Sequence, residues 1–409
     1  MITLYNPLYL FNFQEEITLK IGIIGGSIAG CALALLLKDQ FQVTVFERAD
    51  DLKSRGAGIT ISLELLNALF AKNLIDQDTL SHTCTARSFY CQADNEPVYG
   101  KFLWQQGISM ASLHWDTLFT NLRKRIPDPI YLQGVKVIDV KLKDKGPGQI
   151  TLESGKTLQF DLIVFADGVQ SFGRQLISNA QPEYSGYVAW RGTLEFERIQ
   201  NKTLFNEQGL YYCFNKGHLL TYPVYHHKKN KLNWVFYEKI ALEDLEDLGP
   251  TSFIDFSVKA KEHLYQLAHD KLPQAAAQII LDTQSPFMQK IVDFCAYRLV
   301  TDGALLLGDA STVLRPHVGN GASLAIQDAL SLSEHLKKYE DVQQAINEWE
   351  KDSLPKRVAM YDLSKRMADA LVLQPVEWQE MNASKMLSWW EQILLGEKWY
   401  TTAATQKIC

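Results

Sequence analysis

Apolar and polar positions along the chain change their period twice, and each change predicts a different kind of structure. Residues 21–24 form a short apolar run, residues 28–38 have helical apolar spacing, and residues 42–46 form a second apolar run. This order predicts a strand, a helix and a parallel strand. Between about Tyr184 and Phe236, runs rich in aromatic and β-branched residues are separated by turn residues, which predicts an antiparallel sheet.

A pattern of alternating helices and strands returns after the β-rich region. A helical stretch is expected over about residues 250–281, and the apolar run 304–307 then leads into Gly308-Asp309. We therefore expect an α/β fold in which a Rossmann-like domain is interrupted by an antiparallel sheet. The expected divisions are an N-terminal extension at 1–18, the first part of the nucleotide domain at 19–183, a β-rich substrate domain at 184–285, the second part of the nucleotide domain at 286–372, and a C-terminal helical segment at 373–409.

Composition narrows the function classes. The chain has 409 residues and a formal net charge of -6 without a large basic cluster, which argues against nucleic-acid binding. Six cysteines lack C-x-x-C spacing, so we expect no metal site, no disulfide framework and a reducing, cytoplasmic compartment. No apolar run is long enough to cross a bilayer, and no signal peptide is expected.

The turn after the first predicted strand has the letters GGSIAG, from Gly25 to Gly30. This is the dinucleotide fingerprint G-x-G-x-x-G with Ser27 in place of the second glycine. Glu47 ends the next predicted strand, where a carboxylate can accept hydrogen bonds from ribose hydroxyls. A glycine-rich turn without a nucleotide is the alternative explanation, but the order of strand, turn, helix, strand and acid favours nucleotide binding.

Two later segments also place an acid at the end of an apolar strand. Asp167-Gly168 follows residues 162–165, and Gly308-Asp309 is followed by a P-x-x-G-x-G loop that begins at Pro316. Open α/β sheets bind ligands at the carboxyl ends of their strands. Three such segments in this order therefore predict a long nucleotide cofactor.

In these three segments the chain resembles the flavoprotein aromatic hydroxylases of the p-hydroxybenzoate hydroxylase class. The stretches GGSIAG, SLHWDTL, YSGYVAWRG, LNWVFY and RPHVGNG resemble 2,6-dihydroxypyridine 3-monooxygenase-like enzymes in particular, and the similarity extends over nearly the whole chain after about Leu19. The implied fold is a glutathione-reductase-type FAD-binding domain with an inserted antiparallel substrate sheet and a C-terminal helical segment. Trp115 departs from the class, because many relatives have an arginine there.

The resemblance implies an FAD-dependent monooxygenase that uses NADH or NADPH and O2. It implies hydroxylation, through a flavin C4a-hydroperoxide, of a hydroxylated aromatic or N-heteroaromatic compound by a monomer or homodimer. The implied FAD-binding residues are Gly25, Ser27, Ile28, Ala29, Gly30, Glu47, Arg48, Arg55, Asp167, Asp309, Pro316, Gly319, Asn320, Gly321 and Ala322.

Ionising a phenol-like substrate needs a base or a proton relay. We expect His317, inside RPHVGNG, to be this group and Tyr222 to orient the substrate, with both in contact with it. Trp190 and Arg191, on the predicted sheet, are further substrate-contact candidates. Each of the four also has a purely structural interpretation. Surface positions are expected for His218, His226 and His227.

The C-terminal tryptophans have partly helical spacing, and they predict a helix that packs on the body of the protein or contacts a second copy. They are Trp378, Trp389, Trp390 and Trp399.

Two other functions remain open from sequence. The N-terminal unit alone would fit an NAD-dependent dehydrogenase, although the Asp167 and Asp309 segments lie far beyond a compact NAD domain. A flavin-binding sensor that has lost catalysis would retain every FAD contact, so the sequence does not distinguish it from an enzyme.

Overall fold

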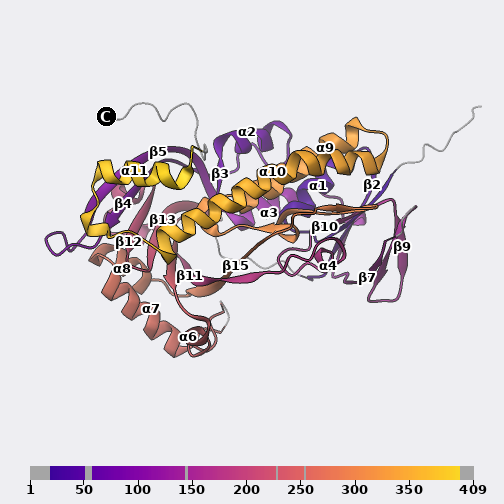
Figure 1. Cartoon of the computed structure of the whole chain (residues 1–409). Coiled ribbons are helices and arrows are strands. Elements are labelled where there is room, and N and C mark those ends of the chain that lie inside the picture. Colours follow the sequence, from indigo (N-terminus) through magenta and orange to yellow (C-terminus); the bar gives the residue numbers. More distant parts are fainter. Residues whose placement is uncertain (1–18, 51–57, 143–145, 227–228, 253–254, 397–409) are drawn as a thin grey trace, which may run out of the picture.

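A computed structural model of the chain describes residues 19–50, 58–142, 146–226, 229–252 and 255–396 (Figure 1). The proposed N-terminal extension, the FAD-binding candidate Arg55, His227 and Trp399 lie outside the described residues. Two large sheets lie end to end along an elongated molecule, and a long helix runs past both (Figure 1).

The first sheet has the predicted nucleotide-domain strands at its centre. Its order is β16-β17-β10-β1-β2-β6, and every pair from β17 to β6 is parallel. Strand β10 is buried along its whole length and β1 at all but its first residue, as expected for strands covered on both faces. The bounds are β1 Lys20–Ile24, β2 Gln42–Glu47, β6 Tyr131–Gln133, β10 Leu162–Phe165, β16 Val300–Thr301 and β17 Ala304–Leu306.

Helix α1 (Ile28–Leu37) lies in the middle of this domain. Nine of its ten residues are buried, and it packs against α9 (Gly321–Lys338) and α3 (Trp115–Arg123). A helix that is apolar on all sides must be covered on all sides, which explains the run CALALLL. A small sheet of β7 (Val137–Lys141), β8 (Gly148–Leu152) and β9 (Thr157–Phe160) completes the domain.

The second sheet is larger than the sequence predicts. Its order is β18-β15-β11-β14-β13-β12-β4-β5-β3, so three strands from residues 58–114 join those after residue 183. The expected limits of 184–285 for a β-rich unit therefore do not coincide with this sheet. The bounds are β3 Gly58–Ser62, β4 His82–Cys91, β5 Lys101–His114, β11 Glu183–Glu195, β12 Gln208–Phe214, β13 Gly217–His226, β14 Lys229–Lys239, β15 Phe287–Cys295 and β18 Thr312–Val313.

Alternation along the strands divides the side chains of the second sheet between two faces, apart from local register shifts in β4 and β11. On one face Trp190, Trp234 and Phe236 pack against α7 (Val258–Lys271) and α8 (Gln274–Leu281) in one apolar cluster. The opposite face meets a C-terminal helical layer over part of its area, where Trp389 and Trp390 pack against Phe89.

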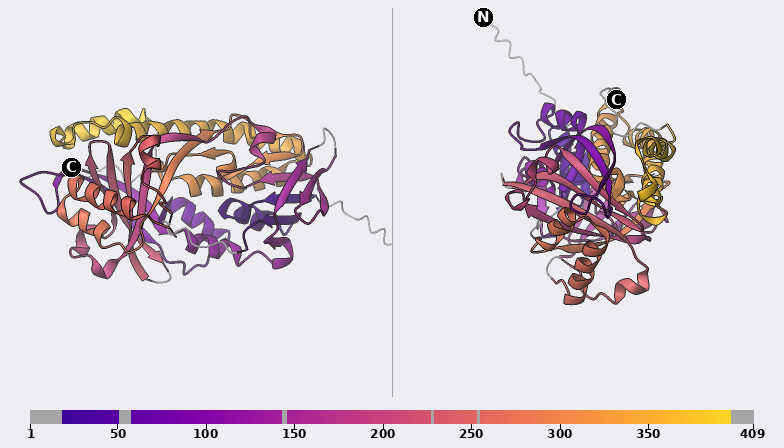
Figure 2. Two further views of the ribbon diagram at one scale, coloured as in Figure 1. Left: turned by 90° about the horizontal axis from the view of Figure 1, so that it is seen from below. Right: turned by 90° about the vertical axis from the view of Figure 1, so that its left-hand side faces the viewer.

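The C-terminal layer consists of α10 (Val342–Ala368), a single π-helical turn (Asp369–Leu373) and α11 (Ala383–Leu394). Helix α10 contacts β16 of the first sheet and β15 of the second, so it bridges the two (Figure 2). Trp378, Trp389 and Trp390 are buried, which confirms the predicted helix packed on the body. The remaining helices are α2 Leu63–Ala71, α4 Arg174–Ile177, α5 Lys202–Phe205 and α6 Leu242–Glu246.

Two further properties concern the helices and the cysteines of the described residues. Every helix in this part of the chain is too short or too polar to span a bilayer. Cys31, Cys84, Cys91, Cys213 and Cys295 are buried free thiols.

Candidate active site

The carboxyl ends of four neighbouring parallel strands meet at one edge of the first sheet. Strands β17, β10, β1 and β2 are adjacent in this order. They end next to Asp309, Asp167, the glycine turn and Glu47, respectively. The three sequence segments are therefore brought together in space, as predicted from their positions after apolar strands.

The glycine turn is sterically restricted. Gly25 has φ +104°, and a Cβ on it would lie 2.3 Å from the carbonyl oxygen of Ala166. A Cβ on Gly30 would lie 1.9 Å from the carbonyl oxygen of Gly25. Both positions therefore require glycine, the first for its left-handed backbone and the second for close helix packing.

Ser27 occupies the N-cap of α1 with extended backbone, φ -82° and ψ -160°, and its side chain makes no capping hydrogen bond. The first helical hydrogen bond runs from the N–H of Cys31 to the carbonyl of Ser27 at 2.8 Å. The N–H groups of the three preceding residues thus point out of the helix end, where an anion is favoured. Serine at this position preserves the anion site, because the residue needs no positive φ.

Glu47 is buried, and its carboxylate clamps the glycine turn. One oxygen accepts the N–H of Gly26 at 2.8 Å and the other accepts the N–H of Ala49 at 2.9 Å. Each oxygen retains a lone pair for a further donor. Arg48 is exposed beside it.

The backbone that follows Asp167 turns back and donates a hydrogen bond to the Asp167 carboxylate. Asp167 Oδ2 accepts the N–H of Phe172 at 2.8 Å, while Oδ1 is buried without a hydrogen-bond partner among the described residues. Burial raises the pKa of this carboxyl group. The buried Arg174 donates to the carbonyls of Val169 at 2.9 Å and Ala310 at 3.4 Å, so it ties the Asp167 segment to the Asp309 turn.

The Gly308-Asp309 turn is held from behind by a buried ion pair. Gly308 has φ +59° and lies against Ala29 in the first turn of α1. The carboxylate of Asp328 on α9 accepts a hydrogen bond from the backbone of Gly308 and pairs with Arg357 of α10, whose side chain is fully buried. Asp309 itself is exposed at the mouth of a cavity.

This cavity, of about 610 Å³, lies between the two sheets. Three of the four predicted substrate-contact residues line it: Arg191, Tyr222 and His317. The loop from Pro316 to Ala322, Asp309 and Trp115 form one wall. The opposite wall is the second sheet, with Arg191, Tyr222 and Tyr237 among its residues. The glycine turn and Glu47 are not part of the lining, so the nucleotide edge and the cavity meet at Asp309.

The cavity loop is anchored by Arg315, which was not predicted as a site residue from the sequence. The Arg315 guanidinium pairs with Asp293 of β15 and, at 3.1 Å, with Asp369 after α10. Gly319 has φ +59° and ends the 3-10 turn Pro316–Val318, and Asn320 is the N-cap of α9. Arg315 is the first residue of RPHVGNG. Its charge could have marked it as an anchor from the sequence, because a charged residue in a buried loop requires partners.

His317 lies in the cavity wall and is buried. Its Nε2 atom lies 3.1 Å from the Tyr187 hydroxyl, and its Nδ1 has no hydrogen-bond partner among the described residues. Burial, with the neighbouring His218, Arg315 and Arg191, lowers the pKa of His317 well below its ordinary value. The ring is therefore neutral at physiological pH, and it can accept one proton-bearing group and donate to another.

Tyr222 also lines the cavity, but its hydroxyl is engaged. It donates to the carbonyl of Gly58 at 2.9 Å, while the N–H of Gly58 donates to Asn233 Oδ1 at 2.8 Å. These two hydrogen bonds hold the start of β3 against β13 and β14 of the same sheet. It offers its ring, rather than a free hydroxyl proton, to the cavity.

Trp190 and Arg191 point to opposite faces of β11, so they cannot both reach the cavity. Arg191 lines the cavity, and its Nε is buried without a hydrogen-bond partner among the described residues. Trp190 faces the α7 and α8 side, where its indole N–H donates to Glu238 at 2.9 Å. The expectation that Trp190 contacts substrate is therefore wrong, because successive strand residues alternate.

The prediction of a surface position for His218 is also wrong. The side chain is fully buried beside Tyr211, Tyr237 and His317, with ring centroids 5.5, 4.8 and 5.2 Å away. Its strand runs through the middle of the second sheet, so a position near the strand end is still covered. Burial lowers the pKa of His218 to about 3.

Several lining residues had no sequence signal. Arg87 stands on β4, outside the stretch predicted as sheet, and its guanidinium lies 4.3 Å from the Trp390 ring centroid. Tyr211 and Tyr237 belong to predicted strands, but the register that turns them to the cavity depends on pairing between distant segments.

Comparisons with known proteins agree with the predicted resemblance. A family model described as FAD binding domain-like matches residues 184–293. The chain is 26% identical over 371 residues to 2,6-dihydroxypyridine 3-monooxygenase of Paenarthrobacter nicotinovorans, covering 86% of this chain and 91% of the relative.

Solved structures share the fold. The structure of 2,6-dihydroxypyridine-3-hydroxylase from Arthrobacter nicotinovorans matches with a TM-score of 0.80 at 24% identity, covering 88% of this chain and 94% of that one. Klebsiella pneumoniae HpxO complexed with FAD and uric acid matches with a TM-score of 0.75 at 18% identity, covering 92% of each chain. The predicted fold class and the resemblance to FAD-dependent aromatic hydroxylases are confirmed.

The buried His218 makes a prediction about pH. The unfolded chain binds a proton at this side chain below about pH 6.5, whereas the folded chain does not until about pH 3. The free energy of unfolding therefore decreases as the pH falls through this window, by up to about 1.4 kcal/mol per pH unit from this group. Urea denaturation between pH 7.5 and 5 should show a shallower decrease for His218→Gln than for the wild type. The exposed His269→Gln serves as the control and should follow the wild type; equal slopes for His218→Gln and wild type would contradict the assignment.

Proposed function

We propose that this protein is an FAD-dependent monooxygenase that uses NAD(P)H and O2 to hydroxylate a small hydroxylated aromatic or N-heteroaromatic compound. The observation that supports it most is the junction at Asp309. There a nucleotide-binding edge built from four strand ends meets a cavity whose far wall is a sheet with aromatic and cationic side chains.

The residues at this edge fit FAD. The outward N–H groups at the start of α1 suit a pyrophosphate, and the Glu47 carboxylate retains lone pairs for ribose hydroxyls. Asp167 Oδ1, a buried acceptor without a donor among the described residues, suits a further hydroxyl of the cofactor or a water. Asp309 lies between this edge and the cavity, where the ribityl chain would pass.

The loop from Pro316 to Ala322 would lie along the flavin ring. Its backbone N–H groups border the cavity and begin α9, so they can stabilise negative charge on the ring. Bound FAD would supply hydride acceptance from NAD(P)H and the activation of O2. The ion pairs of Arg315 fix the loop before any ligand arrives.

The substrate would bind between this loop and the second sheet. Arg191 offers an N–H donor that has no partner among the described residues, which favours a substrate with a hydroxyl, oxo or carboxylate oxygen. His317, neutral and hydrogen-bonded to Tyr187, would accept a hydrogen bond from a substrate hydroxyl through Nδ1 and orient that hydroxyl as it ionises. Its lowered pKa makes it a weak base, so it would pass the proton on rather than keep it. The apolar part of the lining, which includes Ile59, Ile108 and Leu220, would contact the face of the ring.

The two alternatives are less well supported. An NAD-dependent dehydrogenase has no use for the Asp167 and Asp309 segments, which here follow the next two strands beside the fingerprint strand, β10 and β17. A sensor without catalysis is disfavoured by the cavity next to the cofactor edge, because a decayed pocket need not retain Arg191 and His317 on its walls.

Activity of the purified protein tests the proposal. The protein should be yellow, should oxidise NADH or NADPH, and should take up O2 faster when a suitable ring compound is added. The first probes are 2,6-dihydroxypyridine and uric acid, followed by a panel of hydroxylated heteroaromatics. A colourless protein that cannot be reconstituted with FAD would overturn the proposal, and stable FAD binding without NAD(P)H oxidation across the panel would favour the sensor.

Removal of one carboxylate tests the path of the cofactor. Asp309→Ala should lower the FAD content after gel filtration by about tenfold or more, the loss of roughly one charge-assisted hydrogen bond. Thermal unfolding of the stripped protein should change little, because Asp309 is exposed. Asp302→Ala removes an exposed acid from the β16–β17 turn and should retain full flavin content. Equal flavin content in both variants would refute the role of Asp309.

Removal of the cavity imidazole tests proton handling. His317→Ala should retain FAD, because its side chain contacts Tyr187 rather than the nucleotide edge. We expect product formed per NAD(P)H consumed to fall, with a loss of about 10²-fold in hydroxylation rate if His317 moves the proton. Higher pH, which ionises the substrate hydroxyl without a base, should partly restore the rate. An unchanged rate and pH profile would return His317 to a structural role.

A further inference from the structure

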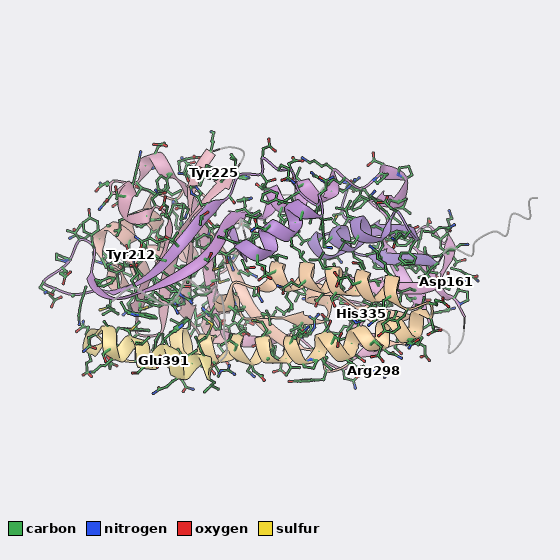
Figure 3. The ribbon with its side chains drawn as sticks, turned by 90° about the horizontal axis from the view of Figure 1, so that it is seen from above. Asp161, Tyr212, Tyr225, Arg298, His335 and Glu391 are labelled. Atoms are coloured by element: carbon green, nitrogen blue, oxygen red, sulfur yellow. The ribbon has the colours of Figure 1, made fainter. Side chains whose placement is uncertain are left out.

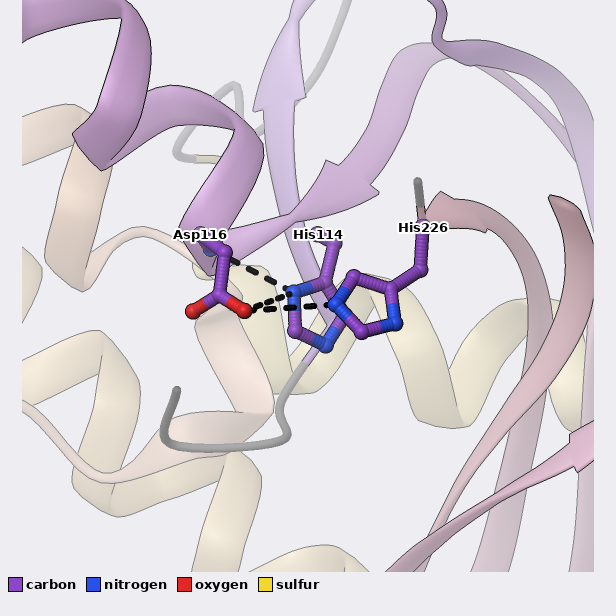
Figure 4. A group of neighbouring side chains, drawn as sticks. All are labelled: His114, Asp116 and His226. Atoms are coloured by element: carbon purple, nitrogen blue, oxygen red, sulfur yellow. Dashed lines mark hydrogen bonds and ion pairs between the residues drawn. The ribbon is translucent and has the colours of Figure 1, made fainter. Parts of the chain in front are cut away.

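A second polar cluster lies where the substrate sheet meets helix α3, and none of its residues lines the cavity. It consists of His114, the last residue of β5, Asp116, in the first turn of α3, and His226, the last residue of β13 (Figure 4). The two histidines are 112 residues apart in the chain, yet their rings stack with centroids 3.8 Å apart. Both rings turn one nitrogen toward the same carboxylate oxygen (Figure 4).

The separations in this cluster match those of ligands around one metal ion. Asp116 Oδ2 lies 3.5 Å from His114 Nδ1 and 3.2 Å from His226 Nε2, and the three ligand atoms lie within 4.8 Å of one another. Bonds of about 2.0–2.2 Å in tetrahedral geometry place neighbouring ligand atoms roughly 3.4 Å apart. The two separations to the carboxylate oxygen fit this spacing, and rotation of the histidine side chains would bring their nitrogens to the same spacing around an ion.

The hydrogen bonding of His114 leaves one ring nitrogen available as a ligand. Its Nδ1 accepts the backbone N–H of Asp116 at 3.3 Å, so this nitrogen presents a lone pair rather than a proton. A bound ion would take over this lone pair from the long hydrogen bond. Asp116 Oδ2, 3.5 Å from the same nitrogen, would supply the negatively charged ligand.

We propose that His114, Asp116 and His226 form a binding site for a divalent transition metal ion of the zinc type. Two imidazole nitrogens and one carboxylate oxygen are a common protein ligand set for such ions. The side chains of Asp116 and His226 are 15% and 18% exposed, against 1% for His114. This leaves an entry path and room for water as a fourth ligand.

The position of the site indicates its effect on the structure. Asp116 belongs to a helix that packs on α1 of the nucleotide domain, whereas His226 ends a strand of the substrate sheet. A bound ion would hold these two parts together next to Trp115, which lines the cavity. The inference does not depend on the proposed reaction, because metal binding is measured without turnover.

Metal titration of the full chain tests the site. Protein purified without a histidine tag, with its flavin in place, is stripped by a chelator and titrated with ZnCl2 by calorimetry. We expect one Zn²⁺ per chain, confirmed by elemental analysis after desalting, and visible d–d absorption when Co²⁺ replaces Zn²⁺. His226→Ala and Asp116→Asn should each weaken binding by more than about 100-fold, the loss seen even for outer-shell substitutions.

A matched variant separates this site from ordinary histidine–aspartate pairs. His335 of α9 lies 3.1 Å from Asp352, with no second histidine beside them among the described residues. Figure 3 shows His335 on a different side of the molecule from Tyr225, the neighbour of His226. His335→Ala should leave Zn²⁺ binding unchanged. Zn²⁺ should also raise the melting temperature of the wild type and of His335→Ala, but not of the two cluster variants. Wild-type protein that binds no Zn²⁺, or binds it no better than His226→Ala, would overturn the proposal and leave the cluster as a hydrogen-bonded contact.

Discussion

The parallel pairing of β17, β10, β1 and β2 is the constraint on which the rest of the site depends. The hydrogen-bond ladder continues one residue beyond the strands: Gly25 N–H bonds to Phe46, Ala166 N–H to Ile24, and Leu307 N–H to Phe165, all at 2.8–2.9 Å. The three turns therefore leave the sheet at the same level. Because the ladder fixes their relative heights, acids from distant parts of the chain are aligned before any side chain makes a contact.

Buried arginines then set the positions of the turns relative to one another. Arg174 joins the second turn to the third, Arg315 holds the cavity loop to β15 and α10, and Arg357 supports Asp328 behind Gly308. A buried guanidinium without any partner is strongly unfavourable, and each ion pair or hydrogen bond that it makes restricts the arrangements its turn can adopt. The loops at this edge thus obtain their order from charged side chains that were not predicted as site residues.

Sequence patterns predicted the parts of the fold that depend on local periodicity. The bounds of β1, α1, β2 and β10 agree with the expected runs to within one residue, and the Asp167 and Asp309 segments lie at the expected strand ends. The extent of the second sheet was not predictable, because β4 pairs with β12 across more than a hundred residues and its own composition is mixed. The predictions for Trp190 and His218 were wrong for the same reason, because the face to which a side chain points and its burial depend on which strands and helices become its neighbours. The cluster of His114, Asp116 and His226 has no sequence spacing that marks it.

The alternation along the second sheet has a consequence for how this protein could diversify. On β11, β12, β13 and β14, the cavity residues and the core residues are interleaved but face opposite sides. Selection can therefore exchange Arg191, Leu220 or Val235 for side chains that recognise another ring, while Trp190, Leu219 and Trp234 maintain the fold. Substrate range and stability therefore become nearly separate traits. A lineage with this sheet can acquire new substrate contacts on the cavity face while the core face stays unchanged.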